Sequence, residues 1–256
     1  SPWTSPPHTN SENTWYLYST DGINFNWSIS QWDFSAIQIG YVIYKNNESL
    51  TISGRETHEL MDVKSHEILH RTIGTFRSSG CGVTAGSILY DTATDAATTP
   101  GFESGVIQDE DLKSNINSWG EGIYTKMYIS GATNSLFDFT GSTPFFPTTN
   151  TFIQLNDPIS GTLTPGINNR YYNVYQIIFP ATSDVNAQKY RMIMLQPQTA
   201  YLSLSAAQNE DINSLYLGEL SIRAAEFILY TRITYLTSSS YTNIGKCLIP
   251  TNGITY

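Results

Sequence analysis

The residues best suited to chemistry form an HExxH motif at His66, Glu67 and His70. They lie in segment 56–72, whose apolar residues recur at near-helical spacing. Residues four positions apart lie on one face of a helix, so His66 and His70 could bind one Zn²⁺. Glu67 could then polarise a metal-bound water for peptide hydrolysis, which makes a zinc metallopeptidase one candidate class.

The sequence around the motif does not complete a known catalytic zinc site. Such a site needs a third protein ligand, but the residues after His70 read RTIGTF and hold no third histidine. The nearest acidic candidates are Glu103 and Glu110. His66 and His70 therefore stay open to three interpretations: a catalytic zinc site, a non-catalytic metal or stacked-histidine role, or structural histidines. We expect no cofactor, with zinc or another transition metal at His66 and His70 as the alternative.

A second group of ionisable residues is the acidic run Asp109, Glu110 and Asp111. The run could bind Ca²⁺, but no DxDxDG loop follows it. Acidic side chains are favourable at the positive end of a helix dipole. The run therefore predicts the start of a short helix over 109–116.

Composition narrows the function classes. The chain has 256 residues, 13 basic and 22 acidic side chains and a net charge of -9. Charged residues make up 14% of the chain and aromatic residues 13%, with 17 Tyr. This composition excludes a coiled coil, and scattered basic residues in an acidic chain argue against nucleic-acid binding. No run of about 18 apolar residues predicts a membrane span.

Short strands dominate the local sequence pattern. Turn signals such as Asp21-Gly22 and Asn252-Gly253 separate runs with period-2 alternation. The predicted fold is mainly β, a sandwich or jelly-roll-like head with one substantial helix near 56–72, and the alternative is α+β. The expected strands are 15–18, 37–44, 123–129, 151–155, 171–179, 190–195 and 227–235.

The expected domain organisation is simple. Residues 1–14 are rich in Pro and Ser and predict an extended N-terminal segment, followed by a single β-rich domain over 15–256. Segment 91–105 carries four Thr and predicts an exposed loop. The two cysteines, Cys81 and Cys247, either pair or stay free and buried.

Several loosely spaced motifs occur in a characteristic order. The run from His66 through His70, Thr72, Gly74 and Phe76 is followed by the acidic run at 109–111. Later come RMIML at 191–195, LxLG at 215–218, AEF at 225–227, YTN at 241–243 and Gly245-Lys246. This order, over roughly residues 15 to 246, resembles tail-fibre and related virion surface proteins of bacteriophages from marine and environmental sources.

The resemblance implies a non-enzymatic, β-rich virion subunit at the virion surface. Such a protein is expected to be a homotrimer that contacts other virion structural proteins and attaches to the host, with a host surface glycan as a possible receptor. In such a trimer, His66 and His70 of the three chains could face the three-fold axis and share a metal ion. No nucleic-acid partner and no membrane insertion are expected. A carbohydrate-binding β module outside a virus is the first alternative, because aromatic residues in a low-charge surface suit sugar stacking. The zinc metallopeptidase through His66, Glu67 and His70 is the second.

Overall fold

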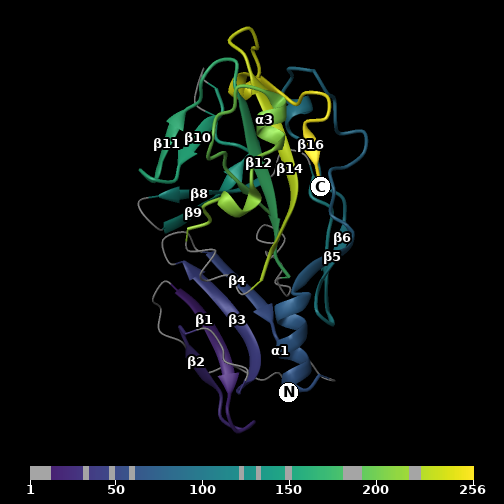
Figure 1. Cartoon of the computed structure of the whole chain (residues 1–256), viewed down its shortest axis with the longest axis vertical. Coiled ribbons are helices and arrows are strands. Elements are labelled where there is room, and N and C mark those ends of the chain that lie inside the picture. The colour runs from purple at the N-terminus through teal and green to yellow at the C-terminus, as the bar shows by residue number, and fades with distance from the viewer. Residues whose placement is uncertain are drawn as a thin grey trace.

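The computed structural model describes residues 13–30, 35–45, 50–57, 61–120, 124–130, 134–147, 152–180, 192–218 and 226–256. In these residues the protein is mainly β, with several largely antiparallel sheets and one helix of substantial length (Figure 1), which confirms the predicted fold class. No helix in these ranges is long and apolar enough to span a membrane.

A four-stranded antiparallel sheet opens the chain, with its strands in the order β2-β1-β3-β4. We call it the N-terminal sheet. Tyr16, Tyr41 and Ile43 are buried on it, while Trp15 and Tyr18 are half-buried. Its strands are β1 (Asn13–Ser19), β2 (Asn26–Ser28), β3 (Ile37–Lys45) and β4 (Leu50–Arg55).

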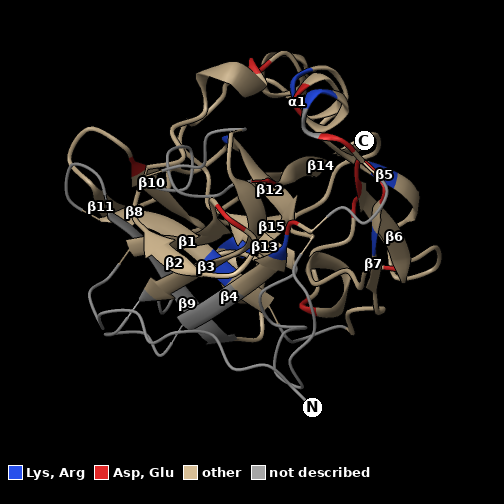
Figure 2. Cartoon of the chain, turned by 90° about the horizontal axis from the view of Figure 1, so that it is seen from below, with Lys and Arg blue, Asp and Glu red and all other residues tan. Residues whose placement is uncertain are grey.

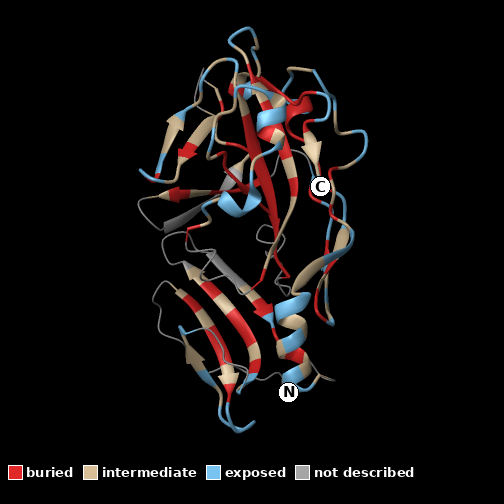
Figure 3. Ribbon diagram, viewed as in Figure 1, coloured by how far each residue is buried: buried red, intermediate tan, exposed pale blue. Residues whose placement is uncertain are grey.

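A larger mixed sheet forms the centre of the molecule, and its only parallel pair among the described strands is β13 with β8. Both faces of its central strands are covered, as the continuous buried stretch of β12 shows in Figure 3. Burial on both sides explains the unbroken apolar run MIML of β13. Its strands are β8 (Tyr124–Ser130), β9 (Asn134–Gly141), β12 (Tyr171–Ile178), β13 (Met192–Leu195), β14 (Ile228–Thr237), β15 (Cys247–Leu248) and β16 (Ile254–Thr255).

Alternate residues of the central strands enter two separate cores. On β13, Met192 and Met194 join one core, which also contains Phe102 and Ile107. Ile193 and Leu195 join the other, which contains Tyr16, Tyr41 and Ile43 of the N-terminal sheet. The central sheet is therefore the middle layer of the fold, since side chains of alternate residues leave a strand on opposite faces.

A three-stranded sheet, β5-β6-β7, contributes Ile107 and Ile116 to the first core. Charged residues are sparse on the sheets (Figure 2), as the composition requires. The remaining elements are β5 (Thr75–Gly80), β6 (Gly105–Asp109), β7 (Leu112–Ile116), β10 (Gln154–Asp157), β11 (Thr162–Pro165), α1 (Val63–Thr72), α3 (Leu204–Gln208), η2 (Ala96–Thr98), η3 (Ile212–Ser214) and η4 (Ile244–Lys246).

The predicted helix over 56–72 is too long at its N-terminal end. Helix α1 begins only at Val63, because the Asp62 carboxylate accepts hydrogen bonds from the backbone N–H groups of Lys64 and Ser65. Glu56 instead follows strand β4, and its N–H donates to the carbonyl of Ile39. Because α1 starts at Val63, Glu56 is not part of the helix that carries the two histidines.

Two further local predictions are wrong. Residues 109–116 are not a helix, because Asp109 ends β6 and pairs with Leu112 of β7 across a two-residue turn. Segment 91–105 is not an exposed loop, since Ala97 and Phe102 are buried in it. Threonine hydroxyls there bond to backbone carbonyls, so a polar sequence can fill buried space.

The other segment predictions have mixed outcomes. The strands expected at 15–18, 37–44, 123–129, 171–179, 190–195 and 227–235 correspond to β1, β3, β8, β12, β13 and β14, whereas the strand expected at 151–155 lies later, as β10. Residues 1–12 of the predicted extended segment lie outside the described residues, and Asn13 and Thr14 already belong to β1. Cys81 and Cys247 are buried free thiols.

At Gly245 a single added methyl group should disturb the first core. Its φ is +77°, and an added Cβ would lie 2.5 Å from Cε2 of the buried Phe145. We expect Gly245→Ala to lower the free energy of unfolding by about 2–4 kcal/mol through the strained backbone and overpacking. Gly120→Ala is the matched control, because nothing lies within 4 Å of its added Cβ. Urea unfolding followed by fluorescence measures both, and equal stabilities of the two variants would contradict the expectation.

Candidate metal centre

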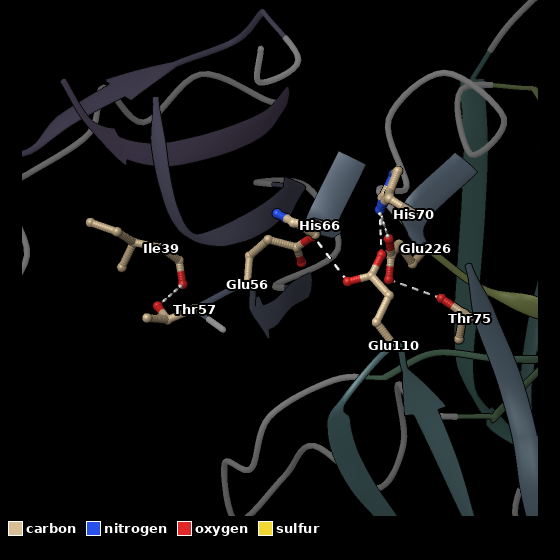
Figure 4. Close-up of polar contacts among 8 residues, drawn as sticks. All are labelled: Ile39, Glu56, Thr57, His66, His70, Thr75, Glu110 and Glu226. Atoms are coloured by element: carbon tan, nitrogen blue, oxygen red, sulfur yellow. Dashed lines mark hydrogen bonds and ion pairs between the residues drawn. The ribbon is translucent and has the colours of Figure 1, made fainter. Parts of the chain in front are cut away.

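Six ionisable side chains converge where α1 and the end of β4 meet the β6–β7 turn and the start of β14. Figure 4 draws all of them except Asp109. They come from four segments of the chain and include the two histidines of the HExxH motif. We call this group the His/carboxylate cluster. Its members are Glu56, His66, His70, Asp109, Glu110 and Glu226.

Helix α1 presents the two histidines together. His66 and His70 are one turn apart, and their ring centroids lie 5.9 Å from each other at an interplanar angle of 86°. The helix ends at Ile73 and Gly74, whose N–H groups both donate to the carbonyl of Leu69. Gly74 has a φ of +55°, which lets the chain reverse directly into β5.

The acidic residues are placed by strand ends and turns. Asp109 is the last residue of β6, and Glu110 begins the turn to β7 with a φ of 50°. Glu226 lies just before β14, and its Oε2 accepts a hydrogen bond of 2.9 Å from the hydroxyl of Thr75. Phe227 packs beside Phe179, with ring centroids 5.9 Å apart, and so fixes the chain next to Glu226.

Each histidine directs one nitrogen at two carboxylates. His66 Nε2 lies 3.3 Å from Glu110 Oε2 and 3.6 Å from Glu56 Oε1. His70 Nδ1 lies 2.7 Å from Glu226 Oε1 and 3.2 Å from Glu110 Oε1. A single N–H can make a good hydrogen bond to only one of two such oxygens. A metal ion bound by one imidazole nitrogen and two carboxylates would hold its ligand atoms in a similar arrangement.

The cluster is closed to solvent on most sides. The side chains of Glu56 and Glu110 are 0% exposed and that of Glu226 is 3% exposed, while His66 is 10% and His70 23% exposed. Burying ionised carboxylates is costly unless cations compensate them. The cluster therefore requires positive charge, from protonated histidines or from a metal ion.

The pKa values show how strongly these groups interact. Burial disfavours the charged form of His66, but hydrogen bonds to Glu110 and Glu56 raise its pKa to about 9. Hydrogen bonds to Glu110 and Glu226 raise the pKa of His70 to about 10.

Two neighbouring acids share one proton. Burial and the adjacent Glu226 raise the pKa of Asp109 to about 12. Burial alone would raise the pKa of Glu226, but hydrogen bonds from His70 and Asp109 lower it. The proton therefore resides on Asp109, and Glu226 is the ionised partner of His70.

Ligand atoms of the cluster form three overlapping triads, and within each triad all atoms lie within 4.8 Å of one another. Imidazole nitrogen together with carboxylate oxygen is a donor set that suits Zn²⁺, Fe²⁺, Mn²⁺ or Co²⁺. The triads are Glu56, His66 and His70; His70, Glu110 and Glu226; and Glu56, Asp109 and Glu226.

The structure separates Glu67 from the histidine pair. Its Oε1 lies 2.9 Å from Nη2 of Arg71 in an ion pair between residues four apart on α1, and its side chain is 37% exposed. A general base must lie within hydrogen-bond reach of the water it activates. In this arrangement Glu67 binds Arg71 and is not one of the grouped ligands.

Other acidic residues considered for the site lie elsewhere. Glu103 and Asp111 are exposed. Of the candidates named beside the motif, only Glu110 joins the histidines. Sequence reasoning missed Glu56 and Glu226, which lie in segments with no metal-ligand spacing of their own.

A buried tyrosine borders the cluster and was also missed. Burial raises the pKa of Tyr41, and the nearby carboxylates of Glu226, Glu56 and Asp109 raise it further. The phenol of Tyr41 therefore stays protonated beside the acids.

Metal binding should release protons, because a bound histidine must be neutral and a bound carboxylate ionised. With pKa values of about 9 and 10, His66 and His70 both carry protons at pH 7 in the metal-free chain. We expect at least two protons to be released per chain, and zinc affinity to rise about 100-fold per pH unit between pH 6 and 8. Calorimetric zinc titrations in buffers of different ionisation enthalpy measure this release. A pH-independent affinity would contradict it.

Comparisons with protein-family models, with curated proteins and with solved structures find no match to this chain.

Proposed function

We propose that this chain is a non-enzymatic structural protein whose fold is braced by a divalent transition-metal centre in the His/carboxylate cluster. One observation carries the proposal. Side chains that could bind a metal come from four separate segments and converge in a buried site, where α1 and the end of β4 meet the β6–β7 turn and the start of β14. A metal ion there cross-links segments that are up to 170 positions apart, from Glu56 to Glu226.

Burial favours a structural role over a catalytic one. Structural metal sites are closed by protein ligands, whereas catalytic sites keep a position open for water or substrate. The side chains of Glu56, Glu110, Glu226 and His66 are each no more than 10% exposed, and that of His70 is 23% exposed. The position of Glu67 on Arg71 supports the same interpretation, because the peptidase mechanism needs that carboxylate at the metal.

Protonated histidines alone do not balance the acidic groups of the cluster. Four carboxyl groups share the cluster with two histidines. Even when both histidines are protonated, the positive charges are fewer than the acidic groups, so Asp109 must hold a proton. A divalent cation bound by neutral histidines supplies the same two positive charges, and it also coordinates several buried carboxylate oxygens at once.

The test is a titration of the metal-free protein with ZnCl₂, followed by calorimetry. We expect saturable binding, the same affinity for Glu67→Gln, and no peptidase activity in the zinc-loaded protein. Absence of zinc binding would overturn the metal centre. Peptide hydrolysis that disappears in Glu67→Gln would overturn the structural role and establish the metallopeptidase.

As the setting of this metal-braced protein we propose a homotrimeric virion surface subunit involved in host attachment. The motif order supports this setting, and so does exposed apolar surface near the β1–β2 connection. Ile23, Ile29 and Ile37 are 77%, 55% and 50% exposed. Interfaces between subunits are depleted in charge, and such apolar side chains are covered in an oligomer.

We expect the purified protein to be a trimer by native mass spectrometry. The double variant Ile23→Asp/Ile37→Asp should shift the population towards monomer, because the new charges would be desolvated in an interface. Ile159→Asp is the matched control, since Ile159 is 90% exposed in another part of the chain. A monomeric wild-type protein would contradict the trimer and leave the carbohydrate-binding β module as the leading alternative setting.

A further inference from the structure

The carboxylate of Glu110 faces both histidines, each with a different oxygen. Its Oε2 lies 3.3 Å from His66 Nε2, and its Oε1 lies 3.2 Å from His70 Nδ1 (Figure 4). Two ligand atoms bound to one zinc ion lie at most about 4.2 Å apart, because each bond is about 2.1 Å long. Both nitrogen–oxygen pairs are short enough to hold an ion, so Glu110 has the orientation of a bridging carboxylate.

Each side of Glu110 has its own second carboxylate. Glu56 Oε1 lies 3.6 Å from His66 Nε2, and Glu226 Oε1 lies 2.7 Å from His70 Nδ1. Each half of the cluster thus contains one histidine, one carboxylate of its own and one oxygen of Glu110. Asp109 is grouped with both Glu56 and Glu226, within 4.8 Å, and so stands between the two halves.

We infer that the cluster is a dinuclear centre, in which Glu110 bridges one divalent ion at His66 and Glu56 and a second at His70 and Glu226. This inference rests on the proposed metal centre and specifies its nuclearity. Paired metal ions in proteins lie about 3.5–4 Å apart, a spacing that one carboxylate can bridge.

The charges agree with two ions. When a second ion displaces the proton of Asp109, four ionised carboxylates and two neutral histidines carry four negative charges, which two divalent cations neutralise. A single divalent cation beside a protonated Asp109 would leave one negative charge buried, which is unfavourable. The same complement of four carboxylates and two histidines holds two ions in the carboxylate-bridged centres of helical bundles.

The backbone at Glu110 is a second, independent observation. Glu110 adopts a φ of 50° in a two-residue hairpin turn, a conformation that favours Gly, Asn or Asp. Glutamate is a poor choice for the turn itself, and its carboxylate lies 3.3 Å from His66 Nε2 and 3.2 Å from His70 Nδ1. Glu110→Gly should therefore keep the β6–β7 hairpin while it removes the bridge.

The test is zinc stoichiometry by native mass spectrometry, with manganese EPR as the second readout. We expect two zinc ions per wild-type chain, and an exchange-coupled spectrum when the metal-free protein is loaded with two equivalents of MnCl₂. Glu110→Gly should lose this coupling and bind no more than one ion tightly. Glu67→Gln, on the exposed face of α1, should match the wild type.

Other outcomes separate the two proposals. One zinc per chain with an uncoupled manganese spectrum would overturn the dinuclear centre and leave a mononuclear metal centre in place. No bound metal would overturn both. Two bound ions that stay uncoupled and unaffected by Glu110→Gly would also overturn the inference, because they would occupy separate sites.

Discussion

Replacing both histidines, in the double variant His66→Ala/His70→Ala, is expected to abolish tight zinc binding and to lower the melting temperature by about 6–20 °C. Both imidazoles are lost as ligands, and the buried carboxylates lose the nitrogens that lie 2.7 to 3.6 Å from them. Leaving buried charges without partners costs about 3–5 kcal/mol. For a chain of this size, each kcal/mol lowers the melting temperature by about 2–4 °C. Calorimetric melting and zinc titration measure the two effects.

The control for this variant lies on the same helix. Lys64 is exposed at the start of α1, and Lys64→Ala removes a charge without touching the cluster. It should change stability by no more than about 0.5 kcal/mol and leave zinc binding intact. A double histidine variant that melts like Lys64→Ala and still binds zinc would show that the histidines neither bind metal nor pair with the carboxylates.

Removing the metal from the wild-type protein is expected to have an effect of similar size. A ligand at 1,000 times its dissociation constant stabilises the folded state by about 4 kcal/mol. Chelation should therefore lower the melting temperature by about 8–16 °C. The loss should be local first: amide protons of α1 and of the β6–β7 hairpin should exchange faster, while those of the doubly covered β12 should not.

The histidine double variant provides the control for chelation. Because it binds no metal, its melting temperature should be the same with and without chelator. If chelator changes neither the melting temperature nor the exchange pattern of the wild-type protein, the histidine–carboxylate pairs stabilise the His/carboxylate cluster without a metal.

Zinc affinity should rise with pH, whereas the stability of the metal-free fold should fall at alkaline pH, because the pKa values of the histidines are raised. Their ion pairs stabilise the metal-free fold fully below about pH 6.5, the unfolded-state value. This stabilisation is lost as the pH rises through the folded-state pKa values of about 9 and 10. Alkaline pH thus weakens the histidine–carboxylate ion pairs of the metal-free fold, but it strengthens metal binding until the histidines are fully deprotonated.

Much of the fold can be predicted from local sequence. Strand β14 alternates buried and half-buried residues over much of its length. Strand β12 is a long segment rich in Tyr, Val and Ile, and β13 is an uninterrupted apolar run. The short hairpin β6–β7 was missed, because LKSNI carries few apolar residues and its burial depends on packing against the central sheet. The start of α1 was misplaced because Asp62 caps the helix inside a continuous apolar pattern.

The metal centre could be predicted only in part. The spacing of His66 and His70 on a helix is a local signal, and the structure brings both nitrogens into one cluster. Glu56 and Glu226 carry no local signal, because the pairing of β4 and the position of β14 bring them to the histidines. Glu110 was weighed as a helical residue, whereas its role depends on a hairpin turn.

The most direct test of the metal centre is an anomalous-difference map from crystals of the zinc-loaded protein, measured at the zinc absorption edge. We predict strong density between Glu110 and the two histidines, with zinc–nitrogen distances of about 2.0–2.1 Å to His66 and His70. A map with no anomalous density in the cluster, and with both histidines still paired to Glu110, would contradict the proposed metal centre.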